Sequence, residues 1–235
     1  SLTDENIKAI TTSNIAALKA TQIKALTSTS VAALQTMQVV ALGEAGIAVF
    51  NADQIASLSG EQVASLTTTQ TAKLSLMQIT ALGSAQIDDL TTLQIASLSM
   101  KQVKAIESQD IAVLTTQQIQ ALSVSNTASL SSAQISNLTN TQIRALSSAQ
   151  VSALGIAQIL AFNTAQIQAL STSAVGALTG YQLSKMRKEQ IAALTTNQAT
   201  EVKPPKEYSA AQGFVSGPIP QSTDNIWQYF VGDTA

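Results

Sequence analysis

The chain has 235 residues, of which 11% are charged and 45% are hydrophobic, and its formal net charge is −2. This balance lacks the basic surface that nucleic-acid binding requires, and it leaves enough apolar residues for a substantial core. The chain contains no Cys and no His, which excludes disulfides, thiol chemistry, imidazole catalysis and the usual zinc sites.

The first ten residues, SLTDENIKAI, hold no basic stretch followed by an apolar stretch, so no secretion signal is recognisable there. The segment LTDENI already has the pattern of a helix start. Further along, no uninterrupted apolar run approaches the roughly 18 residues of a membrane helix. We therefore expect no insertion into a membrane.

An eight-residue repeat, here called the octad, occupies the chain up to about residue 202. A first apolar column begins at Ile7 and returns every eight residues, in 25 copies, until Ala199. A second apolar column follows three residues later, from Ile10 to Val202. The residue before the first column is Gln in 18 of 25 copies and forms the Gln column. Four residues before the first column stands Ser, Thr, Asn or Gly in 21 of 25 copies.

Neither one long helix nor a β-solenoid fits this spacing. Eight residues overshoot two turns of a straight helix by roughly 80°, so the apolar stripe would wander around the surface. The two columns are three residues apart, which would place them on opposite faces of a strand. Both architectures are therefore excluded.

The stretch LTTQQIQAL shows what each octad does instead. A Ser or Thr followed three residues later by Gln is a capping box, which begins a helix. Here Thr115 is the N-cap and Gln118 closes the box, while Ile119 follows in the core and Leu122 ends the helix. The same roles recur in other octads, with Ser147 and Gln150 as capping residues and Ile143 and Leu146 as core residues.

The sequence thus predicts an all-α solenoid of about 25 stacked two-turn helices, each about seven residues long. Helices this short need stacking partners, because they are unstable alone in water. We expect an Ile/Leu interior and a Ser/Thr/Gln/Ala exterior, with Phe50 and Phe162 filling gaps in the core. The pattern leaves the number of helices per coil open, two and four being the values considered.

The composition changes near Lys203, which divides the chain into the octad solenoid at 1–202 and a tail at 203–235. All four Pro residues lie in the tail. We expect the tail to be extended and to dock through its apolar residues, which are Tyr208, Phe214, Ile226, Trp227, Tyr229, Phe230 and Val231. Two arrangements stay open: the tail covers the last coil of its own subunit, or it joins the next subunit head to tail.

A search for chemistry predicts no catalytic, cofactor-binding or metal-binding residue. Asp88 and Asp89 are neighbours in sequence and would point about 100° apart on a helix, so they do not form a working pair. Lys185, Arg187 and Lys188 form a mixed-sign patch with a neighbouring Glu, which favours a solvent face or a contact to the tail. The Gln column is interpreted as a capping device rather than a ladder for glycans.

The octads LSSAQISNL (130–138) and FNTAQIQAL (162–170) resemble the LTTAQIAAL-type repeats of very large, adhesin-like bacterial proteins that are secreted or lie on the cell surface. The resemblance covers about residues 3–202 and implies export and a surface role. We therefore expect a non-enzymatic rod or filament subunit that assembles with copies of itself. A spacer within a giant adhesin, attached to neighbouring domains, and a module that binds glycans or a protein remain alternatives.

Overall fold

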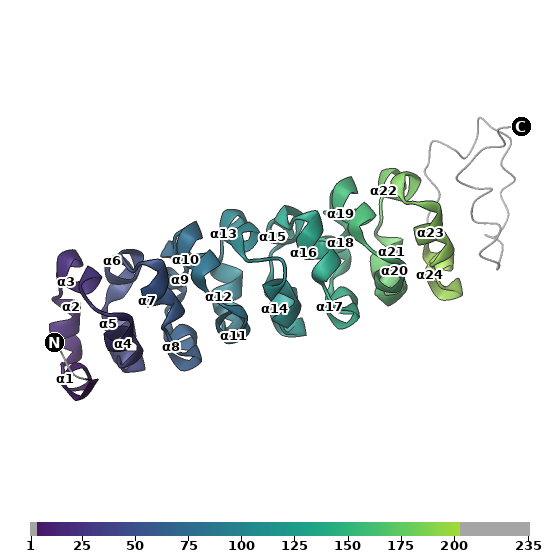
Figure 1. The fold of residues 1–235 in the computed structure, drawn as a ribbon. Coiled ribbons are helices and arrows are strands. Elements are labelled where there is room, and N and C mark those ends of the chain that lie inside the picture. Colours follow the sequence, from purple (N-terminus) through teal and green to yellow (C-terminus); the bar gives the residue numbers. More distant parts are fainter. Residues whose placement is uncertain (1–3, 203–235) are drawn as a thin grey trace, which may run out of the picture. The chain divides into compact units, whose positions relative to one another are not determined.

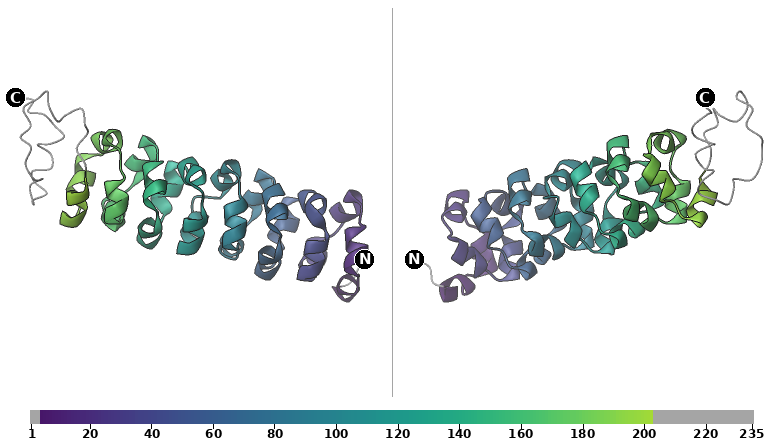
Figure 2. Two further views of the ribbon diagram at one scale, coloured as in Figure 1. Left: turned by 180° about the vertical axis from the view of Figure 1, so that it is seen from behind. Right: turned by 45° about the vertical axis from the view of Figure 1, so that its right-hand side comes forward.

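The computed structural model describes residues 4–202, and within them every octad forms one short helix. There are 24 α-helices of five or six residues and one 3-10 helix, η1, and this range contains no strand. The helices are thus shorter than the expected length of about seven residues; in α14, for example, Leu122 is the C-cap rather than the last helical residue. The chain is an all-α solenoid of short helices joined by sharp corners (Figures 1 and 2).

Two compact units adjoin in sequence between Leu122 and Ser123. Unit 1 contains α1(Asp4–Lys8), α2(Thr12–Ala16), α3(Ala20–Lys24), α4(Ser28–Ala32), α5(Thr36–Ala41), α6(Gly43–Ala48), α7(Ala52–Ala56), α8(Gly60–Ser65), α9(Thr68–Lys73), α10(Leu76–Ala81), α11(Ser84–Asp88), α12(Thr92–Ser97), α13(Met100–Ala105), η1(Asp110–Val113) and α14(Thr116–Ala121). Unit 2 contains α15(Val124–Ser129), α16(Ser132–Asn137), α17(Asn140–Ala145), α18(Ser148–Ser152), α19(Ile156–Ala161), α20(Thr164–Ala169), α21(Thr172–Gly176), α22(Gly180–Lys185), α23(Lys188–Ala192) and α24(Thr196–Glu201).

Within each unit, a helix packs on the helix three octads further along the chain. In unit 1, α2 packs on α5 and α5 packs on α8, whereas in unit 2 α18 packs on α21 and α21 packs on α24 (Figure 1). Hydrogen bonds from the Gln column also reach the helix four octads earlier, as for Gln38 and Ile7. Because each helix has neighbours at both distances, one coil holds between three and four octads, rather than two.

The two apolar columns form the core of both units. The first column is buried from Ile7 onward, and Ile119 and Ile143 are both 0% exposed. Leu122 and Leu146 of the second column are each 3% exposed. Phe50 and Phe162, which take the place of Leu in the second column, are also buried. The Ile/Leu interior therefore follows the spacing of the sequence.

The second column is less buried in the first three octads than in the rest of unit 1. Ile10, Leu18 and Leu26 are half-buried, whereas Leu34 and Leu42 are buried. These three residues belong to the first coil, against which no earlier coil of the described range packs. We call the surface formed by Ile10, Leu18 and Leu26 the N-terminal coil face.

The expected Ser/Thr/Gln/Ala exterior is wrong for most of the Gln column. Gln54, Gln94 and Gln134 are each only 1% exposed. The capping interpretation gave a role to the side-chain oxygen of these residues and none to the amide nitrogen. A buried amide nitrogen needs an acceptor, and the structure shows which atoms supply it.

Candidate functional site: the glutamine ladder

The side-chain oxygen of the Gln column closes a capping box at the start of its own helix. The Gln118 N–H donates to Thr115 Oγ1 at 3.2 Å, and the Thr115 N–H donates to Gln118 Oε1 at 2.6 Å. In the same way, the Gln150 N–H donates to Ser147 Oγ at 3.2 Å and the Ser147 N–H donates to Gln150 Oε1 at 2.9 Å. The box satisfies backbone donors that a helix start leaves open.

The side-chain nitrogen of the same residue caps the end of another helix. Gln94 Nε2 donates to the carbonyl oxygens of Val63 and Leu66, each at 2.8 Å. These two residues stand in the first and second columns, 31 and 28 positions earlier, at the end of the helix four octads back. Helix ends leave carbonyl groups without intrahelical donors, so one amide serves the start of one helix and the end of another.

This double contact repeats through both units and is here called the glutamine ladder. Its donors each reach a carbonyl oxygen 31 or 28 residues earlier, and they are Gln38, Gln54, Gln62, Gln70, Gln78, Gln86, Gln94, Gln102, Gln118, Gln158, Gln166, Gln182, Gln190 and Gln198. The ladder therefore bonds successive coils to each other through main-chain atoms.

The sequence carried a signal for this donor role that the capping interpretation missed. A capping box accepts Glu as readily as Gln, because it uses only the side-chain oxygen. The column nevertheless contains no Glu in 25 copies. Only Gln offers an acceptor and a donor on one side chain of this length, so the absence of Glu indicates that the donor is needed.

The octad of η1 shows what happens where the column holds an acid. Asp110 is 3% exposed and accepts a hydrogen bond from Ser84 Oγ at 2.5 Å. Ser84 is the first residue of α11, so this carboxylate lies at a helix start three octads back, rather than at the carbonyl groups four octads back. A carboxylate cannot donate to carbonyl oxygens, whereas the partial positive charge of a helix start attracts it. This octad forms a 3-10 helix rather than an α-helix.

Replacing Asp110 by Gln is expected to raise the free energy of unfolding by about 1–2 kcal/mol, because the new amide gains the donor contacts to Ile79 and Leu82. Urea unfolding of the chain measures the change. Asp53→Gln removes a negative charge from an exposed helix position and serves as the matched control. If Asp110→Gln is no more stable than this control, the ladder does not extend to this octad.

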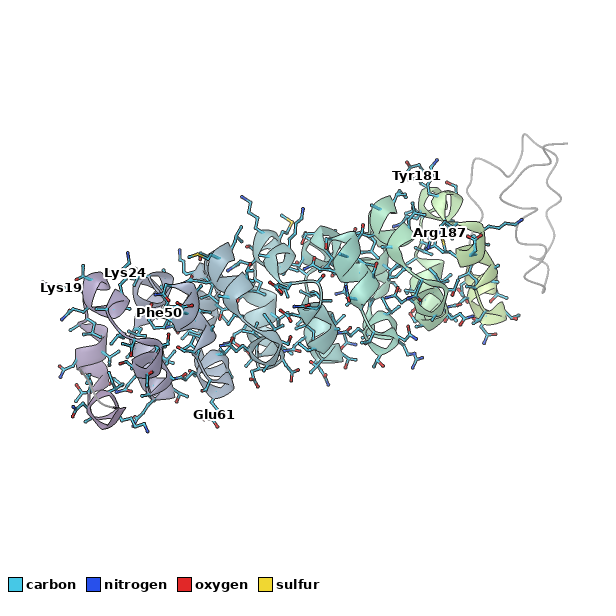
Figure 3. All side chains as sticks on the ribbon, in the orientation of Figure 1. Lys19, Lys24, Phe50, Glu61, Tyr181 and Arg187 are labelled. Atoms are coloured by element: carbon cyan, nitrogen blue, oxygen red, sulfur yellow. The ribbon has the colours of Figure 1, made fainter. Side chains whose placement is uncertain are left out.

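The charged patch predicted around α22 and α23 separates into different roles. Arg187 Nη2 donates to the Phe162 carbonyl oxygen at 3.1 Å, so this guanidinium group contacts the main chain of unit 2. Lys185 Nζ lies 5.5 Å from the centre of the Tyr181 ring, and Tyr181 is 66% exposed on the outer side of α22 (Figure 3). Lys188 is exposed. Within residues 4–202 all three cations are therefore exposed, and a contact of this patch to the tail stays a prediction.

Asp88 and Asp89 are both exposed. Over residues 4–202, no group of three or more His, Cys, Asp or Glu side chains could hold a metal ion. No helix in this range is both long and apolar enough to span a bilayer. The tail residues predicted to join subunits, from Tyr208 to Val231, lie outside the described residues.

Comparison with known proteins finds one family. The family model named ALTTAQ repeat matches residues 7–44, 31–76 and 103–140, so these stretches carry a repeat similar to that of the family. No curated protein matches the chain. The chain is therefore a repeat protein whose octads are similar to ALTTAQ repeats in parts of both units.

Proposed function

We propose that this chain is a non-enzymatic structural element that assembles end to end with copies of itself outside the cell. The observation that carries the proposal is the glutamine ladder, in which the same donor and acceptor groups recur from coil to coil within each unit, as at Gln54 and Gln94. Repeats of this kind are stabilised by contact with a neighbouring coil. A coil from a second copy can supply that contact.

The regularity of the repeat supports assembly as well. Within each unit, the coils bond to one another through the same apolar columns and the same ladder, so the end of one coil is complementary to the start of another. A contact between unlike ends of identical subunits is heterologous and does not close on itself, which leads to filaments. The tail at 203–235, with its aromatic residues, is proposed as a second joint. The resemblance to octads of bacterial surface proteins supports a location outside the cell.

Self-association of the full chain tests this proposal. Sedimentation and negative-stain microscopy over a range of concentrations are expected to show particles that lengthen as the concentration rises. A chain lacking 203–235 is expected to associate at least tenfold more weakly, since it loses the proposed second joint. A full chain that stays monomeric at every concentration would favour the spacer role and contradict the proposal.

One observation favours a second candidate, a module that binds a protein partner. Leu76 and Met77 on α10 and Met100 on α13 are 47%, 61% and 53% exposed, and these two helices pack on each other. Large apolar side chains gathered on an exposed surface are typical of contact sites. Methionine side chains also adapt to varied partners.

A further inference from the structure

Three helices of unit 1 present their first residues in one row. The helices α7, α10 and α13 begin at Ala52, Leu76 and Met100, which are 24 residues apart, and α10 packs on both of the others and lies between them (Figure 1). Thr80 Oγ1 of α10 donates to the Ala105 carbonyl oxygen of α13 at 3.3 Å, which fixes the register of these two helices. The surface formed by the first two residues of each helix is here called the α7–α10–α13 face.

The second residues of these helices place opposite charges on either side of an apolar centre. They are Asp53, Met77 and Lys101, and all three are exposed. Packed helices are about 8–10 Å apart, so Asp53 and Lys101 stand roughly 16–20 Å from each other, too far to form an ion pair. Lys104, also exposed on α13, adds a second cation at the same end. The charges of this face are thus left for another molecule.

The first residues of the same helices change in size along the same direction. Ala52 is half-buried, whereas Leu76 and Met100 are 47% and 53% exposed. The acidic end of the face therefore carries a small side chain and the cationic end carries a large one. Leu76 and Met77 lie between the two ends, and Met77 is 61% exposed.

A surface of this kind is complementary to itself. In an isologous contact, two copies use the same surface about a two-fold axis, so each pair of unlike residues meets twice. With the axis at α10, Met77 lies against Met77 of the second copy, and Asp53 lies against Lys101 of the second copy. Ala52 then lies against Met100 of the second copy, so a large side chain covers a small one.

We propose that the α7–α10–α13 face joins two copies of the chain side by side and in opposite directions, about a two-fold axis at Met77. The apolar centre is removed from water, and the charges set the direction, because a parallel pair would place Asp53 opposite Asp53 and Lys101 opposite Lys101. The inference names a second copy as the protein partner of the second candidate function. It uses no contact between coil ends and so goes beyond end-to-end assembly.

Met77→Asp tests the apolar centre, because it places two like charges opposite each other at the axis. Sedimentation of the full chain over a range of concentrations is expected to show pairing that is at least a hundredfold weaker. Met37→Asp makes the same change at the same octad position of α5, where the side chain is 65% exposed, and is expected to leave pairing unchanged.

Charge reversal tests the direction of the pair. Asp53→Lys and Lys101→Asp each place like charges opposite each other twice, and each is expected to weaken pairing at least tenfold. An equal mixture of the two variants restores both opposite-charge contacts in a mixed pair, and so does a chain that carries both changes. Both are expected to pair about as strongly as the parent chain.

Cross-linking tests the position of the axis. Because the chain has no Cys, Met77→Cys introduces a single thiol, which the axis brings close to the same thiol of the second copy. Mild oxidation of this variant is expected to give disulfide-linked dimers in high yield. Met37→Cys, which has an equally exposed thiol on α5, is expected to remain largely unlinked.

The outcomes separate this inference from the proposed end-to-end assembly. Association that is as strong with Met77→Asp as in the parent chain, or a mixture of the two charge variants that pairs no better than either alone, overturns the inference and leaves end-to-end assembly standing. Pairs that cross-link at residue 77 but never lengthen with concentration support the inference and contradict end-to-end assembly. A full chain that stays monomeric overturns both and leaves the face to a protein other than this chain.

Discussion

Replacing Gln94 by Glu is expected to lower the free energy of unfolding by about 3–5 kcal/mol. The side chain is 1% exposed, and its Nε2 donates to the carbonyl oxygens of Val63 and Leu66. Glutamate keeps the oxygen that accepts from the Thr91 N–H, so the capping box survives. The new carboxylate oxygen then faces two carbonyl oxygens without water, which leaves a buried charge without a donor on that side.

Two further variants separate the causes of this loss. Gln117→Glu introduces the same charge one position earlier in the octad, on the exposed side of α14, and is expected to change the free energy of unfolding by less than about 0.5 kcal/mol. Gln94→Leu removes both hydrogen-bonding roles without a charge, and its expected loss of about 1–3 kcal/mol is smaller. Urea unfolding compares all three. If Gln94→Glu and Gln117→Glu change the free energy of unfolding equally, the donor contacts of Gln94 contribute nothing to stability.

Lowering the pH is expected to reduce the loss of stability caused by Gln94→Glu. A carboxyl group that is buried without a donor is protonated more readily in the folded than in the unfolded chain, so folding takes up a proton. The difference in stability between the variant and the parent chain should therefore shrink as the pH falls toward 4. The Gln94→Leu variant lacks a titrating group and should keep a constant difference over the same range.

The repeat predicted the helices and the core because both depend on neighbours within one octad. A capping box joins residues three positions apart, and the two apolar columns lie on one face of a short helix. Thr115 and Gln118 illustrate this, since both halves of their box were assigned from a single stretch of sequence. Local geometry of this kind is the same in every copy, so 25 copies reinforce one prediction.

The ladder and the size of the coil could not be derived in this way, because they depend on residues about 30 positions apart. An octad spacing is compatible with any whole or fractional number of helices per coil, so the register between coils is open. The partner of Gln94 Nε2 follows only once that register is known. The lack of Glu in the column indicated that a donor was needed, but not which carbonyl oxygens received it.

Substitution of Phe162 measures how much a side chain that departs from the repeat contributes to stability. This residue is 0% exposed in the second column, where most octads have Leu, and its carbonyl oxygen accepts from Gln190 Nε2 at 2.9 Å. Phe162→Ala is expected to lower the free energy of unfolding by about 3–5 kcal/mol, because it leaves a cavity between packed helices. The ladder contact uses a main-chain atom and does not require the aromatic ring.

Phe162→Leu restores the usual residue of the column and is the matched comparison. If the ring fills a gap that Leu cannot fill, this variant should lose about 1–2 kcal/mol, as a smaller side chain leaves a smaller void. If the Phe162→Leu variant is as stable as the parent chain, the core of unit 2 accommodates either side chain, and Phe162 is not required for stability. Urea unfolding distinguishes the two results. Hydrogen exchange at the Phe162 amide, which donates to Ile159, shows whether the end of α19 stays closed in both variants.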